Sequence, residues 1–412
     1  MALPLSTAPL PAGSPAGEPL PTDLDSLLAL AEETGARLAP LAAEVDAGRS
    51  TGHETYRILR DAGLLGLLVP REAGGAGLGF AGYSRVLAVL GAHNGAAALG
   101  FNMHNVAIGS LCESAGTPLP PAAETFRSWL FDKVIHGRKI FASATSEAGS
   151  GAKLRGVRTT YRPTGDGRSY VITGQKSFVS LAGVADYYVV AARAEGTEGS
   201  GEVSHFVVAA DDAGVGFGEV HSLSAMYGTS TAGMVLDAVT VPRSRLFLGV
   251  EGMSLYKLVR EPHWMISGYT GAYLGIAEAV FRFTRDHVAS SPDRAASPVL
   301  QRELGRMSAR LSAARALVNE AGARIDAGRG GVDANAAVHA AKYVVGEVGP
   351  ALAQDAVRIC GSAAVSRSMP LERLLREASF ASVMPAKPDE CLEYLGKAAL
   401  GVNLYDATAF SW

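Results

Sequence analysis

The sequence predicts an α+β fold in which one β domain lies between two helical domains. Apolar residues recur at spacings of three and four over residues 23–136 and again over residues 251–412, which indicates amphipathic helices. Between these regions, residues 137–250 contain short β-type runs separated by turns. Helices, then strands, then helices predict a β domain inserted between two helical ones.

The N-terminal region combines a tail with two helical stretches. Residues 1–22 are rich in Pro, Ala, Gly and Ser and lack the basic start and apolar core of a secretory signal, so we expect a flexible tail. Helical periodicity follows in LDSLLALAEETGARLAPLAAEVDAG and in FAGYSRVLAVLGAHNGAAALGFNMHNVAIGSL. Pro70 and four glycines exclude a helix from the intervening GLLGLLVPREAGGAGLGF.

The hydrophobic pattern of the central region is typical of strands, and that of the C-terminal region is typical of helices. YVITGQKSFV, DYYVVAAR, SHFVVAA and GMVLDAVTV are β-type runs, and Gly-, Asp- and Ser-rich turns separate them. After residue 250, helices of several turns are predicted in YLGIAEAVFRFTRDHVA, VLQRELGRMSARLSAARALVNEAGARID and NAAVHAAKYVVGEVGPALAQDAVRIC.

Composition narrows the possible functions. The 412 residues carry a formal net charge of -3 and 19% charged residues, without the concentrated basic face that binds nucleic acid or a membrane surface. No apolar run approaches the roughly 18 residues of a membrane span. The three cysteines, Cys112, Cys360 and Cys391, are far apart and predict neither a disulfide framework nor a metal cluster. A cytoplasmic location without a metal is the simplest interpretation.

Four motifs in order sharpen this interpretation. GLLGLLVPREAGGAGLGF, TGQKSFVSLAGVADYYVVAAR, SAMYGTSTAGMVLDAVTVPRSRLFLG and QDAVRICGSAAVSRSMPLERLLRE span nearly the whole chain after the tail. They resemble the corresponding segments of the acyl-CoA dehydrogenase superfamily. For example, TGQKSFVS is similar to the family's N-G-x-K-x-W-I-T. Any one match could arise by chance, whereas four in the same order are a strong signal.

The resemblance implies a specific fold and chemistry. Such proteins have an N-terminal helical domain, a central β-barrel domain and a C-terminal helical bundle, and they bind FAD. The resemblance also implies a homodimer or homotetramer that completes the cofactor site. The reaction in such enzymes is α,β-dehydrogenation of an acyl-CoA or acyl-carrier-protein thioester. A carboxylate takes the α-proton, and the β-hydrogen leaves as hydride to the flavin. The resemblance also implies an electron-transfer partner that reoxidises the flavin.

The resemblance also places the flavin on particular residues. Phe178 stands where the family usually has a Trp against the isoalloxazine face, and Ser180 replaces a Thr whose hydroxyl lies near flavin N5. In ATSEAGSG, which is similar to the family's T-E-P-x-x-G-S-D loop, Ser146, Gly149 and Ser150 are expected to present hydroxyl and N–H groups to the flavin. The structural alternatives are a core position for Phe178 and an ordinary turn for the loop.

Two departures from the family pattern concern the cofactor. The R-x-x-F-G segment is RDHVASSPDRAASP here, with Arg294 as the nearest substitute for its Arg. The later G-G-x-G turn is GSAA, so only Gly361 remains of its first two glycines. Fewer glycines restrict close backbone approach. FAD is the expected cofactor, and FMN or a loosely held reduced flavin is the alternative.

A third departure removes the usual catalytic base. A gapless count from the ERLLRE segment places Pro385 where most family members have Glu. A minority of the family carries the Glu on the first C-terminal helix, and the matching position here is Met265. Glu261 is four residues earlier, so it shares that helix face. Since Pro262 could end the helix, Glu261 could equally be a solvated residue.

Other groups are further candidates for the base. Asp389 and Glu390 follow the lost position closely. His104 and His263 are also candidates for the base, although a lone His more often has a structural role. We rank Glu261 first, then Glu390 and Asp389.

Three functions remain open from the sequence. The first is flavin-dependent dehydrogenation of an acyl thioester with a relocated base. The alternative is a flavin-dependent monooxygenase of the same fold, which uses O2 and reduced flavin from a separate reductase and needs no Glu. A non-catalytic flavin-binding homologue is the third, and the retained aromatic and hydroxyl groups argue against it.

Overall fold

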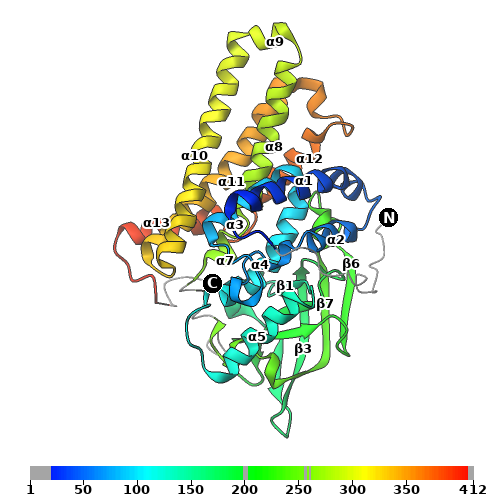
Figure 1. Ribbon diagram of the computed structural model, residues 1–412, viewed down its shortest axis with the longest axis vertical. Coiled ribbons are helices and arrows are strands. Elements are labelled where there is room, and N and C mark those ends of the chain that lie inside the picture. The colour runs from blue at the N-terminus through cyan, green and yellow to red at the C-terminus, as the bar shows by residue number, and fades with distance from the viewer. Residues whose placement is uncertain (1–19, 198–202, 255–257, 259–260, 407–412) are drawn as a thin grey trace.

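A computed structural model describes residues 20–197, 203–254, 258 and 261–406, and Figure 1 shows their arrangement. The β domain forms one end of the molecule, and long C-terminal helices project from the other. Most of the N-terminal helices lie between these two parts, and the last of them lies beside the β domain. The order of helical, β and helical domains is the one that the sequence predicts. Most of the tail, residues 1–19, lies outside the described residues.

Five helices form the N-terminal domain. They are α1 (Leu24–Asp46), α2 (His53–Asp61), α3 (Phe80–His93), α4 (Gly95–Glu113) and α5 (Pro121–Ile135). Asp23 caps α1 by accepting a hydrogen bond from the Ser26 N–H, and Asn94 caps α4 in the same way. The Gly-rich stretch before α3 contains only two short 3₁₀ turns, Leu64–Gly66 and Arg71–Ala73, in agreement with the helix-breaking residues there.

Seven strands form a single sheet. They are β1 (Phe141–Ala144), β2 (Thr160–Pro163), β3 (Ser169–Val179), β4 (Tyr187–Ala194), β5 (Val203–Ala209), β6 (Val215–Val220) and β7 (Ala232–Pro242). The order is β1-β4-β2-β3-β7-β6, and β5 pairs with β4 along its other edge. Val190 of β4 pairs with both Ala144 of β1 and Phe206 of β5, so β1 and β5 lie on opposite sides of β4.

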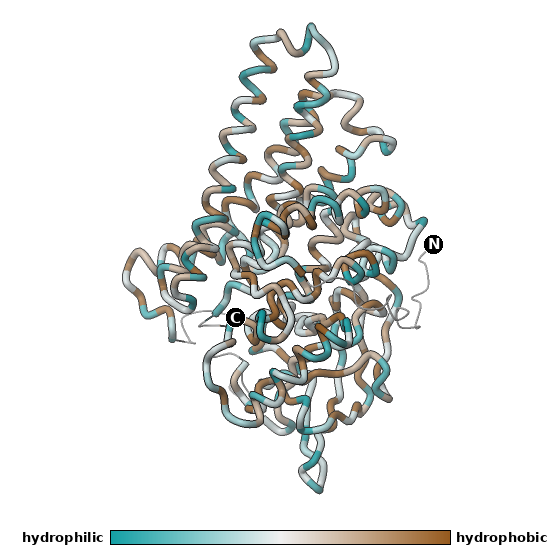
Figure 2. Tube along the Cα trace, viewed as in Figure 1, coloured by the Kyte–Doolittle hydropathy of each residue, from teal (hydrophilic) through white to brown (hydrophobic). Residues whose placement is uncertain are grey.

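The C-terminal domain is helical throughout its described part. Its helices are α7 (His263–Ile266), α8 (Thr270–Ala289), α9 (Pro292–Ala296), α10 (Pro298–Gly328), α11 (Val332–Cys360), α12 (Pro370–Ser379) and α13 (Pro388–Ala399). Ser297 caps α10, and Pro298 occupies its first turn. Figure 2 shows apolar and polar residues interspersed along these long helices, as expected for helices with one packed and one solvent-facing side.

Backbone contact between α3 and α8 joins the two helical domains. A Cβ at Gly275 would meet the Ala88 carbonyl oxygen at 2.1 Å, and a Cβ at Gly91 would meet that of Ala272 at 2.4 Å. Only glycine permits this approach. The contact fixes the short helix α7, which precedes α8, against the N-terminal domain and beside the β domain.

Within the described part of the chain, no helix is both long and apolar enough to cross a bilayer. The same residues hold no cluster of three His, Cys, Asp or Glu side chains that could bind a metal ion.

Candidate active site

A buried ion pair anchors the loop after β1. Lys176 on β3 donates to Glu147 Oε1 and to the Ala191 carbonyl oxygen, each at 2.7 Å. Glu147 also accepts from the Arg158 N–H at 2.8 Å and the Thr159 hydroxyl at 2.7 Å. Burial lowers the pKa of Lys176 to about 8, although Glu147 opposes this shift. Burial alone would raise the pKa of Glu147, but Lys176 and the hydrogen bonds outweigh it and lower that pKa.

The anchored loop runs beside the end of β3. The Ser146 carbonyl accepts from the Ser177 N–H at 2.9 Å. Gly149 has a φ of 89°, which favours glycine, and Ser150 Oγ is buried with no hydrogen-bond partner among the described residues. The structure therefore brings Ser146, and the loop that continues to Ser150, next to the strand segment with Phe178 and Ser180.

The end of β3 exposes an aromatic face. Phe178 is 57% exposed, which is unusual for a large apolar side chain on a central strand. Its ring centroid lies 4.7 Å from that of His221, whose Nε2 lies 2.7 Å from the Ser177 carbonyl oxygen. Phe178 is thus not a core residue. An exposed, laterally supported ring fits the stacking surface that a flavin needs.

The hydroxyl groups of Ser180, Thr231 and Thr229 form a hydrogen-bonded chain near the Phe178 ring. The Thr229 hydroxyl donates to the Met226 carbonyl at 2.8 Å, so Thr231, 2.8 Å from it, must donate to Thr229. The only proton left for the 3.1 Å contact between Ser180 and Thr231 is that of Ser180. Ser180 therefore presents a lone pair outward until a ligand rotates its hydroxyl. A hydroxyl beside an exposed ring also fits a flavin edge.

Gly361 is not part of this surface within a single chain. It ends α11 with a φ of 61°. Figure 1 shows the segment between α11 and α12 near the helical end of the molecule, away from β3. A role in flavin binding would therefore require a neighbouring chain.

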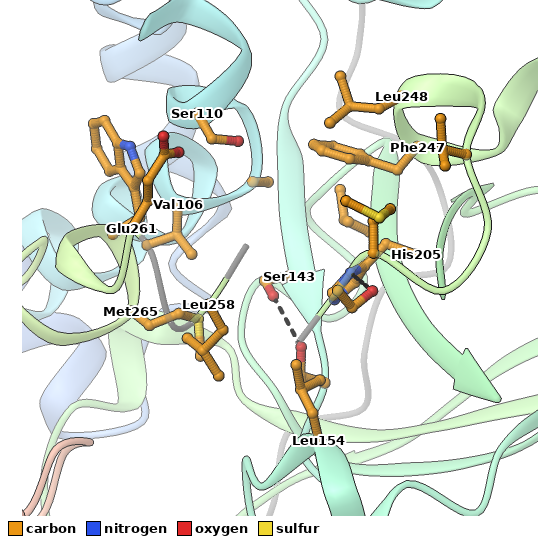
Figure 3. Close-up of a pocket in the computed structure, with 17 residues that line it drawn as sticks. Val106, Ser110, Ser143, Leu154, His205, Phe247, Leu248, Leu258, Glu261 and Met265 are labelled. Atoms are coloured by element: carbon orange, nitrogen blue, oxygen red, sulfur yellow. Dashed lines mark hydrogen bonds between the residues drawn. The ribbon is translucent and has the colours of Figure 1, made fainter. Parts of the chain in front are cut away.

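A cavity of about 120 Å³ lies between the helices and the sheet, as Figure 3 shows. Its wall is mostly apolar and comes from α4, β1, β4, β5, Thr145, Leu154 and described residues of the segment after β7, namely Phe247, Leu248, Val250, Met253, Ser254, Leu258, Glu261, Trp264 and Met265. The polar side chains in the wall are those of Ser110, Ser143, Thr145, His205, Ser254 and Glu261. Thr145 lines the cavity, and the carbonyl of the next residue, Ser146, accepts from the N–H of Ser177, the residue before Phe178.

Glu261 is the only one of the ranked base candidates that lines this cavity. Figure 3 shows its carboxylate beside Ser110, on the wall opposite His205. The side chain is 27% exposed and lies 3.7 Å from the Arg329 guanidinium. Met265 lines the same cavity, so the two positions on this segment do share one site. Glu261 lies outside the helix, because α7 begins only at His263 after Pro262, so the two residues share the cavity but not a helix face.

The remaining carboxylates lie elsewhere. Glu390 belongs to the first turn of α13, where its Oε2 accepts from the Lys387 N–H at 2.8 Å. Asp389 is an exposed residue of the same turn. Pro385 carries no ionisable group, and its carbonyl accepts from the Tyr269 hydroxyl at 2.6 Å. Neither Asp389 nor Glu390 lines the cavity.

Both histidine candidates have structural partners. His104 Nδ1 accepts from the Phe141 N–H at 3.0 Å, and its Nε2 lies 3.1 Å from the Leu65 carbonyl oxygen. Burial lowers the pKa of His104 to about 4, against a smaller opposing effect of the Leu65 bond. His263 Nε2 lies 2.9 Å from Glu113. Neither ring lines the cavity.

Sequence reasoning did not single out Lys176, Glu147, His205, Ser254 or the two threonines. A charged Lys inside the β-type run TGQKSFV was the one available signal, since a strand interior seldom buries an unpaired charge. The Ser254–His205 contact joins residues 49 apart and could not be found from spacing.

Comparisons with known proteins identify the family. The N-terminal, middle and C-terminal domains of acyl-CoA dehydrogenases match residues 27–119, 142–239 and 268–384. The chain belongs to the acyl-CoA dehydrogenase superfamily. It is 27% identical to cyclohexane-1-carbonyl-CoA dehydrogenase of Geobacter metallireducens over 351 residues, 84% of this chain and 89% of that protein.

Two solved structures share the fold. Butyryl-CoA dehydrogenase from Megasphaera elsdenii superposes with a TM-score of 0.83 at 22% identity, over 93% of this chain and 100% of that one. FMN-bound TdsC from Paenibacillus sp. A11-2 gives a TM-score of 0.80 at 22% identity, over 92% of this chain and 100% of that one.

Proposed function

We propose that this chain is a flavin-dependent dehydrogenase that forms the α,β double bond of an acyl thioester. The observation that supports it most is that one loop connects the cavity to the expected flavin-binding residues. The loop after β1 links a cavity that contains the Glu261 carboxylate, through Thr145, to the end of β3 with Phe178 and Ser180, through the Ser146–Ser177 hydrogen bond. Family membership and the relative that acts on a CoA thioester support the same reaction.

The residues divide the chemistry among them. Glu261 accepts the α-proton at a carboxylate oxygen. Ser143 and Thr145, whose hydroxyl oxygens lie 3.4 Å apart in the cavity wall, are donors for the negative charge that develops on the thioester oxygen. Bound flavin would supply the acceptor for the β-hydrogen and its electron pair. The apolar wall excludes water from the carbanion-like centre.

The residues present fit a flavin ring at the end of β3. Phe178 would stack on the ring, Ser180 would meet an edge, and Ser146, Gly149 and Ser150 would contact it from the loop. FAD is the cofactor we propose from family membership. Because Gly361 lies at the helical end of the chain, an adenine contact there would have to come from a second copy.

A homodimer or homotetramer therefore forms part of the proposal. Several large apolar side chains of the C-terminal domain are exposed in the single chain, among them Val365, Val383 and Leu400, which are 65%, 65% and 83% exposed. Burial of these side chains against a second copy would remove apolar surface from water. Turnover would also need a protein that accepts electrons from the site. All three cysteines are buried and free, which suits the predicted cytoplasmic location.

Substitution of Glu261 tests the assigned base. Glu261→Gln keeps the size of the side chain and removes the proton acceptor, so turnover should fall on the order of a hundredfold or more with flavin still bound. Asp389→Asn and Glu390→Gln are matched carboxylate-to-amide controls on α13 and should stay within about threefold of wild type. A larger loss in either control than in Glu261→Gln would reassign the base.

A flavin-dependent monooxygenase is the second candidate function. It is favoured by Pro385, which leaves no carboxylate at the usual position, and by the Ser180 lone pair, which suits the N5–H of a reduced flavin. The FMN-bound fold relative agrees with it. Incorporation of an oxygen atom from O2 into a product, with no dependence on Glu261, would establish it instead.

A further inference from the structure

The hydroxyl chain that begins at Ser180 ends at a backbone carbonyl inside the protein. Ser180 Oγ lies 3.1 Å from Thr231 Oγ1, which lies 2.8 Å from Thr229 Oγ1. The Thr229 hydroxyl donates to the Met226 carbonyl at 2.8 Å. Thr229 and Thr231 are only 2% and 6% exposed, whereas Ser180 is half-buried. The chain therefore joins a partly exposed hydroxyl group to the carbonyl acceptor of a buried residue.

Other hydrogen bonds fix the segment that carries the two threonines. The Leu181 N–H donates to the Thr229 carbonyl at 2.8 Å, and the Tyr56 hydroxyl of α2 donates to the Gly228 carbonyl at 2.6 Å. Because Leu181 directly follows Ser180, these bonds set the spacing of the chain independently of its hydroxyl–hydroxyl contacts. Removal of one hydroxyl group should therefore leave the segment in place.

The chain can carry its protons in two directions. Each hydroxyl group has one proton to donate and lone pairs that accept, so the choice of one member sets the choice of the others. When every proton points inward, the last one reaches the Met226 carbonyl, and Ser180 keeps a lone pair for an outside N–H donor. When every proton points outward, Ser180 donates to an outside acceptor. Ser180 can thus serve either kind of ligand atom while the threonines stay paired with each other.

The N5 atom of a flavin presents both kinds of group in turn. Oxidised flavin has a lone pair at N5 and accepts a hydrogen bond, whereas reduced flavin has an N5–H and donates one. Beside oxidised flavin either direction gives three hydrogen bonds, namely three inside an inward chain, or two inside an outward chain and one to N5. Beside reduced flavin the inward chain gains a fourth, from N5–H to Ser180. The reduced state therefore has one hydrogen bond more.

We propose that Thr229 and Thr231 are positioning residues that favour reduced flavin, because they give the Ser180 proton an acceptor when N5 carries a hydrogen. This inference rests on the proposed flavin site at Phe178 and Ser180. Without the chain, Ser180 would still donate to oxidised flavin, but its proton would lose its acceptor beside reduced flavin. Loss of either threonine hydroxyl group removes the one extra hydrogen bond of the reduced state.

The two-electron potential of the FAD-loaded protein tests this inference, measured anaerobically against a reference dye. Thr229→Val and Thr231→Val each keep the size of the side chain and remove one hydroxyl group. The ratio of the Kd of reduced FAD to that of oxidised FAD should rise about fivefold in each, which lowers the potential by about 20 mV. Thr231→Ser, which keeps the hydroxyl group, should retain the wild-type potential.

Further variants separate this role from a general effect on folding. Thr34→Val, at a threonine of α1 that is 1% exposed, is the matched control and should leave the potential unchanged. In Ser180→Ala the chain no longer reaches the flavin, so the addition of Thr231→Val should change the potential no further.

Three results would overturn the inference. They are a change of less than about twofold in the Kd ratio for both valine variants, an undiminished effect of Thr231→Val in the Ser180→Ala background, and a Thr231→Ser variant that behaves like Thr231→Val. The dye titration uses no acyl thioester, so it does not depend on the proposed dehydrogenation. Failure of that reaction would be seen separately, as bound FAD that no acyl thioester reduces.

Discussion

Removing the charge of Lys176 should destabilise the β domain severely. The Lys176 and Glu147 side chains are 0% and 2% exposed, and Nζ lies 2.7 Å from Oε1. Lys176→Met keeps the bulk of the chain but leaves a carboxylate buried without its counter-ion. Breaking one partner of such a pair costs about 3–5 kcal/mol. Equilibrium urea unfolding, followed by circular dichroism, should show this loss in the free energy of unfolding.

Two further variants establish the cause of that loss. In Lys176→Met/Glu147→Gln no charge remains buried, so about half or more of the lost free energy should return. Arg158 also lies 3.8 Å from Glu147, but its side chain is 68% exposed, so Arg158→Met should cost less than about 1 kcal/mol. The reasoning is refuted if Lys176→Met stays within about 1 kcal/mol of wild type, or if the double variant is no more stable than the single one.

Three other outcomes are expected. Phe178→Ala should weaken flavin binding by about tenfold in a fluorescence titration because the stacking surface is lost, and an unchanged Kd would remove the ring from the site. His104 has a folded-state pKa of about 4 against 6.5 for the free side chain, so the native state takes up its proton less readily than the unfolded chain. The contribution of His104 to the free energy of unfolding should therefore be complete above pH 6.5 and be lost as the pH falls toward 4. His104→Gln should flatten this pH dependence, and an unchanged slope would show that His104 is charged in the folded state. Sedimentation should give a dimer or larger species, and a monomer that retains flavin on dilution would contradict the proposed assembly.

Periodicity was enough to predict the three-domain order because each region keeps one hydrophobic period over many residues. The exposed face of Phe178 followed from motif resemblance, since a strand pattern alone would have buried it. Glu261 was singled out because residues four apart share a helix face, although α7 begins only at His263 and Glu261 reaches the cavity from outside the helix. Its rank above Glu390 could not be settled from spacing, because only the folded chain shows Glu390 bonded to the Lys387 N–H.

The polar wall of the cavity was beyond sequence reasoning for a different reason. His205 meets Ser254 only through the pairing of β4 with β5 and the return of residues 247–254 over the sheet. Likewise, Lys176 reaches Glu147 across 29 positions. Long-range contacts of this kind depend on register, which a single sequence leaves open.

The central claim is that Glu261 and a flavin at Phe178 together dehydrogenate an acyl thioester. Anaerobic titration of the flavin-loaded protein with acyl-CoA thioesters tests it most directly, with the visible absorbance of the oxidised flavin as readout. We expect stoichiometric loss of that absorbance in wild type and a rate lower by about a hundredfold or more in Glu261→Gln. Absorbance that persists with every thioester, together with O2-dependent oxygenation of a substrate by the reduced protein, would contradict it.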